Sequence, residues 1–162
     1  MASNRHLGRI IALQTLYELT FRKECGDTMV KADAIMQRNI TRYKATLDDI
    51  AFIEKLGAEV EKHADELDKL LQPIAPEWPL AQIARIDHVI LQMGAYELQH
   101  HDDVPRKVVI NEAVELAKGF GGDNSSKFVN GVLGTLLRQL YPEEATAAEK
   151  PAKSSKAKKE EV

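Results

Sequence analysis

A polar, glycine-rich segment near the C-terminal end of the chain carries the groups best suited to binding chemistry. This segment, residues 119–128, reads Gly-Phe-Gly-Gly-Asp-Asn-Ser-Ser-Lys-Phe, separates two stretches of helical periodicity, and is called the elbow below. Hydroxyl groups, an ammonium group and the free N–H groups of a helix start are standard contacts of a phosphate. Aromatic rings beside such groups stack on unpaired bases. The elbow therefore indicates a nucleic-acid site with five candidate residues: Phe120, Ser125, Ser126, Lys127 and Phe128.

The same elbow residues also have simpler interpretations. Ser125 or Ser126 serves equally well as the cap of the following helix, because a serine hydroxyl accepts from the first free N–H groups. Either phenylalanine fits a hydrophobic core. The residue types alone leave both interpretations open.

A second group of cations lies at the start of the chain. Arg5 and Arg9 are i, i+4 neighbours, and their row continues into Leu13 and Leu16. Because this stripe changes from basic to apolar, we expect the first turns to overhang the body with both guanidinium groups in water. Cations at a helix N-terminus oppose the helix dipole by about 0.3–1 kcal/mol each unless an anion binds. The two arginines are either ordinary surface residues or part of an anion site.

Enzyme motifs fit the sequence poorly. It contains no G-x-G-x-x-G dinucleotide motif, no G-x-x-x-x-G-K-[ST] phosphate loop and no G-x-S-x-G nucleophile turn. The run His100–Asp103 resembles metal ligands, but adjacent side chains diverge, and zinc sites use separated pairs. His63 falls on an apolar row and is expected at the edge of the core. We predict no catalytic residue, no metal and no cofactor, and a hydrolase using His100–Asp103 is the least favoured class.

Composition is that of one soluble domain. The 162 residues are 44% hydrophobic and 29% charged, with a net charge of -3. No apolar run approaches the roughly 18 residues of a membrane span, and the N-terminus does not resemble a secretory signal. Cys25 is the only cysteine, so an internal disulfide is impossible, and a cytoplasmic location is expected. The negative net charge confines any phosphate contact to local basic spots.

Apolar periodicity predicts an all-α fold. Trp78, between prolines, is expected to cover the core, Asp103 to cap the helix that starts at Pro105, and Gly131 and Gly134 to permit a close helix crossing. The predicted helical stretches are 3–21, 28–43, 48–70, 79–100, 105–118 and 126–140. Beyond Pro142 the sequence lacks hydrophobic clusters, so we predict a domain over residues 1–142 and a disordered Ala/Lys/Glu-rich tail over 143–162.

Four stretches resemble a known family. Residues 12–17 read Ala-Leu-Gln-Thr-Leu-Tyr, 90–98 read Ile-Leu-Gln-Met-Gly-Ala-Tyr-Glu-Leu, and 103–105 read Asp-Val-Pro followed by Val-Ile-Asn-Glu-Ala-Val-Glu-Leu-Ala-Lys at 109–118. Residues 127–133 read Lys-Phe-Val-Asn-Gly-Val-Leu. In this order and spacing they resemble the NusB transcription antitermination factors, with a match from about Arg5 to Leu140.

The resemblance implies a non-enzymatic role in a helical bundle of two small packed halves. It implies a heterodimer with the small-subunit ribosomal protein NusE that binds the boxA element of nascent, single-stranded RNA. With NusA and NusG, this complex helps RNA polymerase to read through terminators, notably in ribosomal RNA operons. The family's RNA-contacting positions carry over to Arg5, His6, Arg9, Phe120, Lys127 and Phe128, and its ribosomal-protein contacts to Tyr17 and Asp87.

The sequence departs from the family pattern in two ways, and alternative functions are left open. Leu7 and Gly8 interrupt the basic run, which predicts a lower intrinsic RNA affinity. Asn124 stands where the family can carry an acid. The loss of that negative charge beside a phosphate would partly offset the lower RNA affinity. A helical protein-interaction module, or a ribosome-assembly chaperone without RNA contact, is the alternative function. A fused RNA methyltransferase is disfavoured, and the sequence leaves open whether the free protein is a monomer or a homodimer.

Overall fold

The computed structural model describes residues 2–144, with side chains from Arg5 onward, and these residues form an all-α fold without strands. Seven α-helices and three short 3-10 helices follow one another in this part of the chain. The α-helices are α1 (Ala2–Glu24), α2 (Ala32–Tyr43), α3 (Ile50–Lys62), α4 (Ala64–Leu71), α5 (Arg85–His100), α6 (Arg106–Phe120) and α7 (Ser125–Leu140). The 3-10 helices are η1 (Lys44–Thr46), η2 (Gln72–Ile74) and η3 (Leu80–Gln82). The predicted fold class is confirmed.

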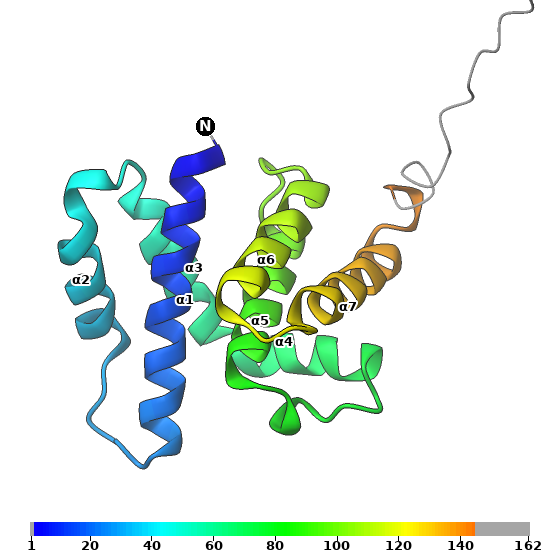
Figure 1. The fold of residues 1–162 in the computed structure, drawn as a ribbon, viewed down its shortest axis with the longest axis horizontal. Helices are drawn as coiled ribbons and strands as arrows, with labels where there is room; N and C mark the ends of the chain where they lie inside the picture. Colours follow the sequence, from blue (N-terminus) through cyan, green and yellow to red (C-terminus); the bar gives the residue numbers. More distant parts are fainter. Residues whose placement is uncertain (1, 145–162) are drawn as a thin grey trace, which may run out of the picture.

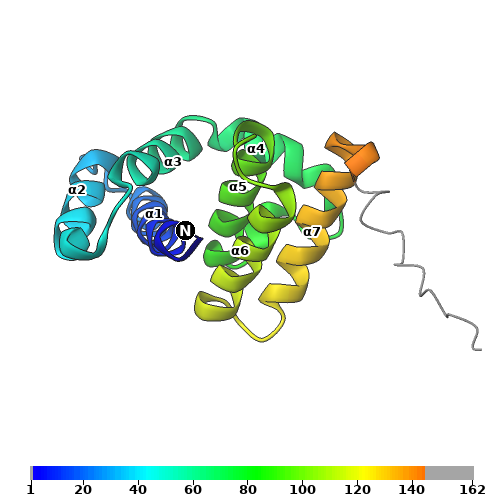
Figure 2. The same ribbon diagram turned by 90° about the horizontal axis from the view of Figure 1, so that it is seen from above.

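The helices form two packed halves. One half contains α1, α2 and α3, and the other contains α4, α5, α6 and α7 (Figures 1 and 2). The first helix lies against α5 and thereby joins the halves, whose apolar side chains form one continuous buried cluster. Residues 89–98 of α5 are buried without interruption, so the helix lies centrally, as its apolar flanks predict.

Close helix packing depends on glycines other than the two predicted ones. A side chain at Gly94 of α5 would lie 2.6 Å from Leu133 of α7, and one at Gly8 of α1 would lie 2.9 Å from Ile53 of α3. Gly131 has open space around it, and the nearest group to Gly134 is the Arg138 side chain of the same helix. The prediction of a close crossing at these two residues is wrong, because they lie on the outer face of α7.

The long helix predicted over residues 48–70 is two helices. Asp49 caps α3 by accepting from the N–H of Phe52 at 3.0 Å, and the helix ends at His63, whose backbone leaves helical geometry. The change of direction lets Leu67 and Leu71 of α4 enter the core. His63 lies at the core edge, as predicted, with its ring stacked near Tyr96.

The proline-containing segment after α4 does not cover the core with its tryptophan. Trp78 is 60% exposed, whereas Leu80 is buried, so the prediction for Trp78 is wrong. The Gln72 amide oxygen accepts from the N–H of Leu80 at 3.1 Å and holds the segment closed. Leu80 is thus the residue fixed against the core.

The ends of α6 also differ from the prediction. Pro105 is the residue before α6 rather than its first turn, and Asp103 does not cap the helix but accepts from Arg5. Gly119 lies inside α6, which ends one residue later.

Beyond α7, residues 142–144 form a helical turn, and Arg106 donates to Glu144 at 2.6 Å. The rest of the tail predicted over 143–162 lies outside the described residues. Within 2–144, no helix has the length and apolar character needed to cross a membrane.

Candidate nucleic-acid and partner interface

A buried ion pair joins the two halves at the start of α1. Arg9 of α1 and Glu97 of α5 are each 2% exposed. The Arg9 guanidinium donates from Nη2 to Glu97 Oε1 at 2.8 Å and from Nε to Oε2 at 3.0 Å. This bidentate geometry is the strongest form of a charged hydrogen bond. The prediction that both guanidinium groups lie in water is therefore wrong for Arg9, because α5 presents a carboxylate to it inside the core.

The environment of Glu97 keeps its carboxylate charged. Burial on its own would raise the pKa of this carboxyl, but the His101 ring and the Arg9 guanidinium outweigh burial and hold the pKa below its usual value. His101 Nδ1 lies 3.5 Å from Glu97 Oε1, which is an ion-pair distance rather than a short hydrogen bond.

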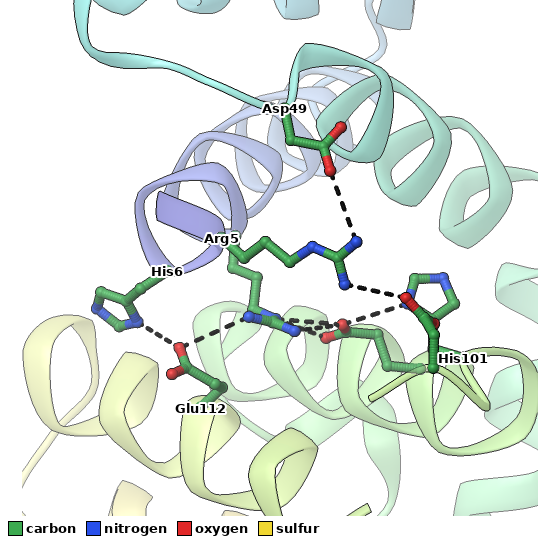
Figure 3. Close-up of polar contacts among 8 residues, drawn as sticks. Arg5, His6, Asp49, His101 and Glu112 are labelled. Carbon is green, nitrogen blue, oxygen red and sulfur yellow. Dashed lines mark hydrogen bonds and ion pairs between the residues drawn. The ribbon is translucent and has the colours of Figure 1, made fainter. Parts of the chain in front are cut away.

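The two other predicted cations of α1 are partly exposed and matched with acids (Figure 3). Arg5 donates from Nη1 to Asp103 at 3.2 Å and lies 3.6 Å from Asp49 through Nη2. The His6 ring donates from Nδ1 to Glu112 Oε2 at 2.6 Å. The side chains of Arg5 and His6 are 34% and 36% exposed, so solvent reaches both. The hydrogen bond from Arg5 also lowers the pKa of Asp103.

One aromatic ring lies close to both arginines of α1. The Phe52 ring of α3 has the Arg5 guanidinium 4.6 Å and the Arg9 guanidinium 5.2 Å from its centre. Cation–π contacts of this kind stabilise a charge that has lost water. Phe52 therefore holds both cations at the junction of α1, α3 and α5.

One of the elbow residues is turned inward. Ser125 is only 6% exposed, and its hydroxyl donates to Asp87 Oδ2 at 3.0 Å while accepting from the N–H of Gly122 at 2.9 Å. The residue preceding α7 is Asn124, whose side chain makes no capping hydrogen bond. The Ser125 side chain thus ties the elbow to α5.

The other predicted elbow residues are accessible to different degrees. Phe120 is 43% exposed and Lys127 is exposed, whereas Ser126 and Phe128 are partly buried. Phe128 also packs against the core cluster. The elbow therefore presents an aromatic ring and an ammonium group to solvent beside an uncapped helix start.

The cations of α1 and the elbow are connected through α6. Glu112 in the middle of α6 accepts from His6 and lies 3.8 Å from Arg9 Nη1, while the elbow begins at the C-terminal end of the same helix. The helix between Glu112 and Gly121 spans about 13 Å at 1.5 Å per residue. Among the described residues, α6 rather than a direct bond links the two groups (Figure 1).

The two predicted partner-binding residues contact different neighbours. Tyr17 is 38% exposed, and the Arg85 guanidinium lies 5.6 Å from its ring and 5.1 Å from the ring of Phe21. Arg85 also pairs with Glu24. Asp87 is 7% exposed and points to the elbow instead. Tyr17 and Asp87 both lie near the start of α5, but they contact different side chains.

Several residues of this region were not predicted. They are Glu97 and Glu112, which hold the cations of α1, Phe52, which stacks on them, and Arg85 and Trp78, which line the outer surface. The sequence did carry one signal: Glu97 stands in the apolar row of α5, and an acid there requires a buried cation. The partner of that acid is 88 residues away.

The described side chains do not form a metal site. Within residues 2–144, no group of three or more His, Cys, Asp and Glu is arranged to hold an ion. In the run His100–Asp103, Asp102 accepts from Arg106 and Asp103 from Arg5. These acids are engaged in ion pairs.

The described residues form an all-helical protein of two packed halves, joined by a buried ion pair. The sequence profile of the NusB family matches residues 6–138. The transcription antitermination protein NusB of Dehalococcoides mccartyi is 39% identical over 140 residues, which cover 86% of this chain and 94% of that protein. The Myxococcus xanthus protein of the same name is 40% identical over 129 residues, 80% of this chain and 91% of that one. The chain belongs to the NusB family, whose members are transcription antitermination factors and not enzymes.

Solved structures agree in fold. A structure of T. maritima NusB has a TM-score of 0.76 at 26% identity and covers 88% of this chain and 96% of its own. A crystal structure of the antitermination factors NusB and NusE in complex with dsRNA has a chain with a TM-score of 0.74 at 20% identity, covering 86% of this chain and 99% of its own. At that identity the second likeness is one of fold.

Proposed function

We propose that this protein binds boxA-type single-stranded RNA as a heterodimer with the ribosomal protein NusE. This complex, with NusA and NusG, promotes read-through by RNA polymerase, notably in ribosomal RNA operons, and it acts in the cytoplasm. The observation that carries the proposal is the elbow, which offers exposed Phe120 and Lys127 beside the uncapped start of α7. An unpaired base stacks on such a ring, and a phosphate is held by the ammonium group and the helix N–H groups.

The proposed RNA residues differ in burial, and we propose two roles for them on that basis. Arg5, His6, Phe120, Ser126, Lys127 and Phe128 retain accessible surface and are the proposed contacts. Arg9 and Ser125 are buried and bonded, so they are proposed as positioning residues that fix α1 and the elbow.

The partner protein is expected to supply much of the affinity. The chain has a net charge of -3, and Arg5 and His6 already pair with acids. RNA affinity depends on cations that neutralise phosphates, so the protein alone should bind weakly and with a shallow salt dependence. A chain of similar fold occurs in the solved complex of NusB, NusE and dsRNA, which supports RNA binding together with NusE.

The test is a titration of boxA-type RNA with this protein, with NusE and with both, at two salt concentrations. Lys127→Ala should weaken the ternary complex and reduce the salt slope by about 1, as expected for loss of one phosphate contact. Lys31→Ala, an exposed cation just before α2, is the matched control and should change neither. An RNA affinity of the mixture no tighter than that of NusE alone would contradict the proposal.

One observation favours the alternative of a protein-interaction module. All three basic side chains of the first α1 turns have acidic partners inside the protein: Arg5 has Asp103, His6 has Glu112 and Arg9 has Glu97. A module without RNA contact would form the complex with NusE and add nothing to RNA affinity. The same titration separates the two functions.

A further inference from the structure

The segment that joins α2 to α3 carries basic and aromatic side chains outside the sites described above. Arg42 and Tyr43 are near and at the last position of α2, and Lys44 begins η1. All three residues are exposed, Tyr43 by 36%. This run, residues 42–44, is called the α2 end below. It combines two cations with a ring, and these are the groups that hold the backbone and the bases of a single strand.

The cations of the α2 end are not engaged by acids. Within residues 2–144, the ion pairs include neither Arg42 nor Lys44. The start of α1 differs in this respect, because Arg5 and His6 each have an acidic partner. An unpaired cation can replace the counterions of a phosphate without first breaking an ion pair inside the protein. The α2 end is therefore better prepared for phosphate than the start of α1.

The α2 end lies close to the proposed RNA contact Arg5. The chain runs from η1 to Asp49, whose carboxylate lies 3.6 Å from Arg5 Nη2. Lys44 precedes Asp49 by five residues, so their Cα atoms are at most about 18 Å apart. The link between α2 and α3 and the first turns of α1 lie at the same end of the molecule (Figures 1 and 2). An RNA strand that reaches Arg5 can thus continue over the α2 end.

A shallow, open depression keeps the surface around Arg5 basic on the α3 side. Its two acids, Asp49 and Asp103, both pair with Arg5. Lys55 and His100 in its wall are exposed. The depression is lined by Arg5, Asp49, Ala51, Phe52, Lys55, His100, His101 and Asp103. A phosphate passing Arg5 therefore meets a further cation rather than an unpaired acid in this depression.

We propose that the α2 end is a second RNA-binding surface, which holds nucleotides that flank the boxA element. Arg42 and Lys44 bind phosphates there, and Tyr43 stacks on an unpaired base. The proposal rests on the proposed function, because it extends the same RNA strand beyond the elbow and α1. It also supplies cations from another helix where Leu7 and Gly8 interrupt the basic run of α1.

The position of the two cations also has a purely structural effect. Cations near the C-terminal end of a helix interact favourably with the helix dipole. This effect accounts for Arg42 and Lys44 without a ligand, but it does not account for the exposed Tyr43 ring between them. RNA affinity and thermal unfolding of each variant below must therefore be measured together.

The first test removes the two charges and measures binding of a long boxA-type RNA to the complex with NusE. Arg42→Gln with Lys44→Gln removes two phosphate contacts. Counterion release on a single strand then predicts about 25-fold weaker binding at about 0.1 M salt, and a salt slope smaller by about 1.4.

The matched control is Lys31→Gln with Lys62→Gln. It removes the same charge from two exposed residues, one just before α2 and one at the end of α3, at the far ends of the same helices. This variant should bind RNA like the parent. Equal losses of affinity in the two double variants would reduce the effect to net charge and overturn the proposal.

The ring is tested separately. Tyr43→Ala should weaken RNA binding about 5- to 150-fold, the effect of losing one base stack, and should leave the salt slope unchanged. Tyr43→Phe keeps the ring and should bind like the parent. Parent-like affinity of Tyr43→Ala would contradict the stacking role.

RNA length separates this inference from the proposed function. The boxA element alone should bind the parent and the Arg42/Lys44 double variant equally, in each case with NusE. Adding several nucleotides on one of its two sides should tighten binding to the parent but not to the double variant. If the element binds but neither extension tightens binding, or both proteins gain equally, the proposed function stands and this inference is wrong. If the element does not bind the parent with NusE, the proposed function itself fails.

Discussion

The two places where this protein combines polar groups, the junction at the start of α1 and the elbow after α6, differ in what those groups are bonded to. At the junction, Arg9 is enclosed by Glu97 and the ring of Phe52. At the elbow, Ser125 is turned inward and Phe128 packs partly against the core, whereas Lys127 and Phe120 remain open to solvent. The junction therefore holds the two halves together, while the elbow keeps groups available for a ligand.

The contrast also holds within a single helix. Arg5 and Arg9 lie one turn apart on α1, yet the side chain of one is 34% exposed and that of the other 3%. Exposed ion pairs contribute about 0–1 kcal/mol, whereas breaking a buried pair costs roughly 3–5 kcal/mol. Burial decides which of two identical residues is structural.

The largest expected effect comes from breaking the buried pair. Arg9→Ala leaves the Glu97 carboxylate unpaired inside the protein and should lower the free energy of unfolding by about 3–5 kcal/mol, measured by urea denaturation. Arg5→Ala is the matched control, with an expected loss below about 1 kcal/mol. Equal losses of unfolding free energy for Arg9→Ala and Arg5→Ala would contradict the assignment of a structural role to Arg9 and not to Arg5.

Removing the inward-facing hydroxyl of the elbow should have an intermediate effect. Ser125→Ala leaves Asp87 Oδ2 and the Gly122 N–H without their shared partner, and should destabilise by about 1–3 kcal/mol. Ser126→Ala, on the adjacent partly buried serine, serves as the comparison and should change unfolding little. A larger loss of unfolding free energy for Ser126→Ala than for Ser125→Ala would contradict the assignment of the structural hydroxyl to Ser125.

A smaller effect is expected from pH. The pKa of Glu97 is lowered in the folded state, so its stabilising contribution is present above its unfolded value, near 4.5, and is lost as the pH falls through the folded pKa. Replacing the pair by Arg9→Met with Glu97→Leu should therefore flatten the acid limb of stability against pH. Urea midpoints measured from neutral to acid pH would test this, and an unchanged acid limb would contradict it.

The smallest effect on the fold should come from the open side of the elbow. Phe120→Ala removes a ring that is 43% exposed, and should change stability by less than about 0.5 kcal/mol, as for most surface substitutions. In the NusE complex, this variant should lose roughly 1–3 kcal/mol of RNA-binding free energy if a base stacks on the ring. Calorimetric unfolding and RNA titration of one preparation separate the two quantities.

Local patterns predicted the helices better than their ends. The apolar rows located α5 and its central burial, because side-chain periodicity reflects the face that a helix buries. The break at His63 escaped prediction, since the apolar spacing of residues 53–70 continues across it. Trp78 was placed in the core because large aromatics are mostly buried, yet Leu80 fills that role.

The sequence by itself determined the all-α class, the family and the residue types that meet a phosphate, since these depend on periodicity and on motifs read along the chain. Only the tertiary structure decided which of those residues are free to act. Arg9 and Glu97 are 88 residues apart, and nothing near either one in the sequence marks the other as its partner. Whether a charge is a ligand contact or a structural bond depends on what surrounds it, and packing between distant helices sets those surroundings.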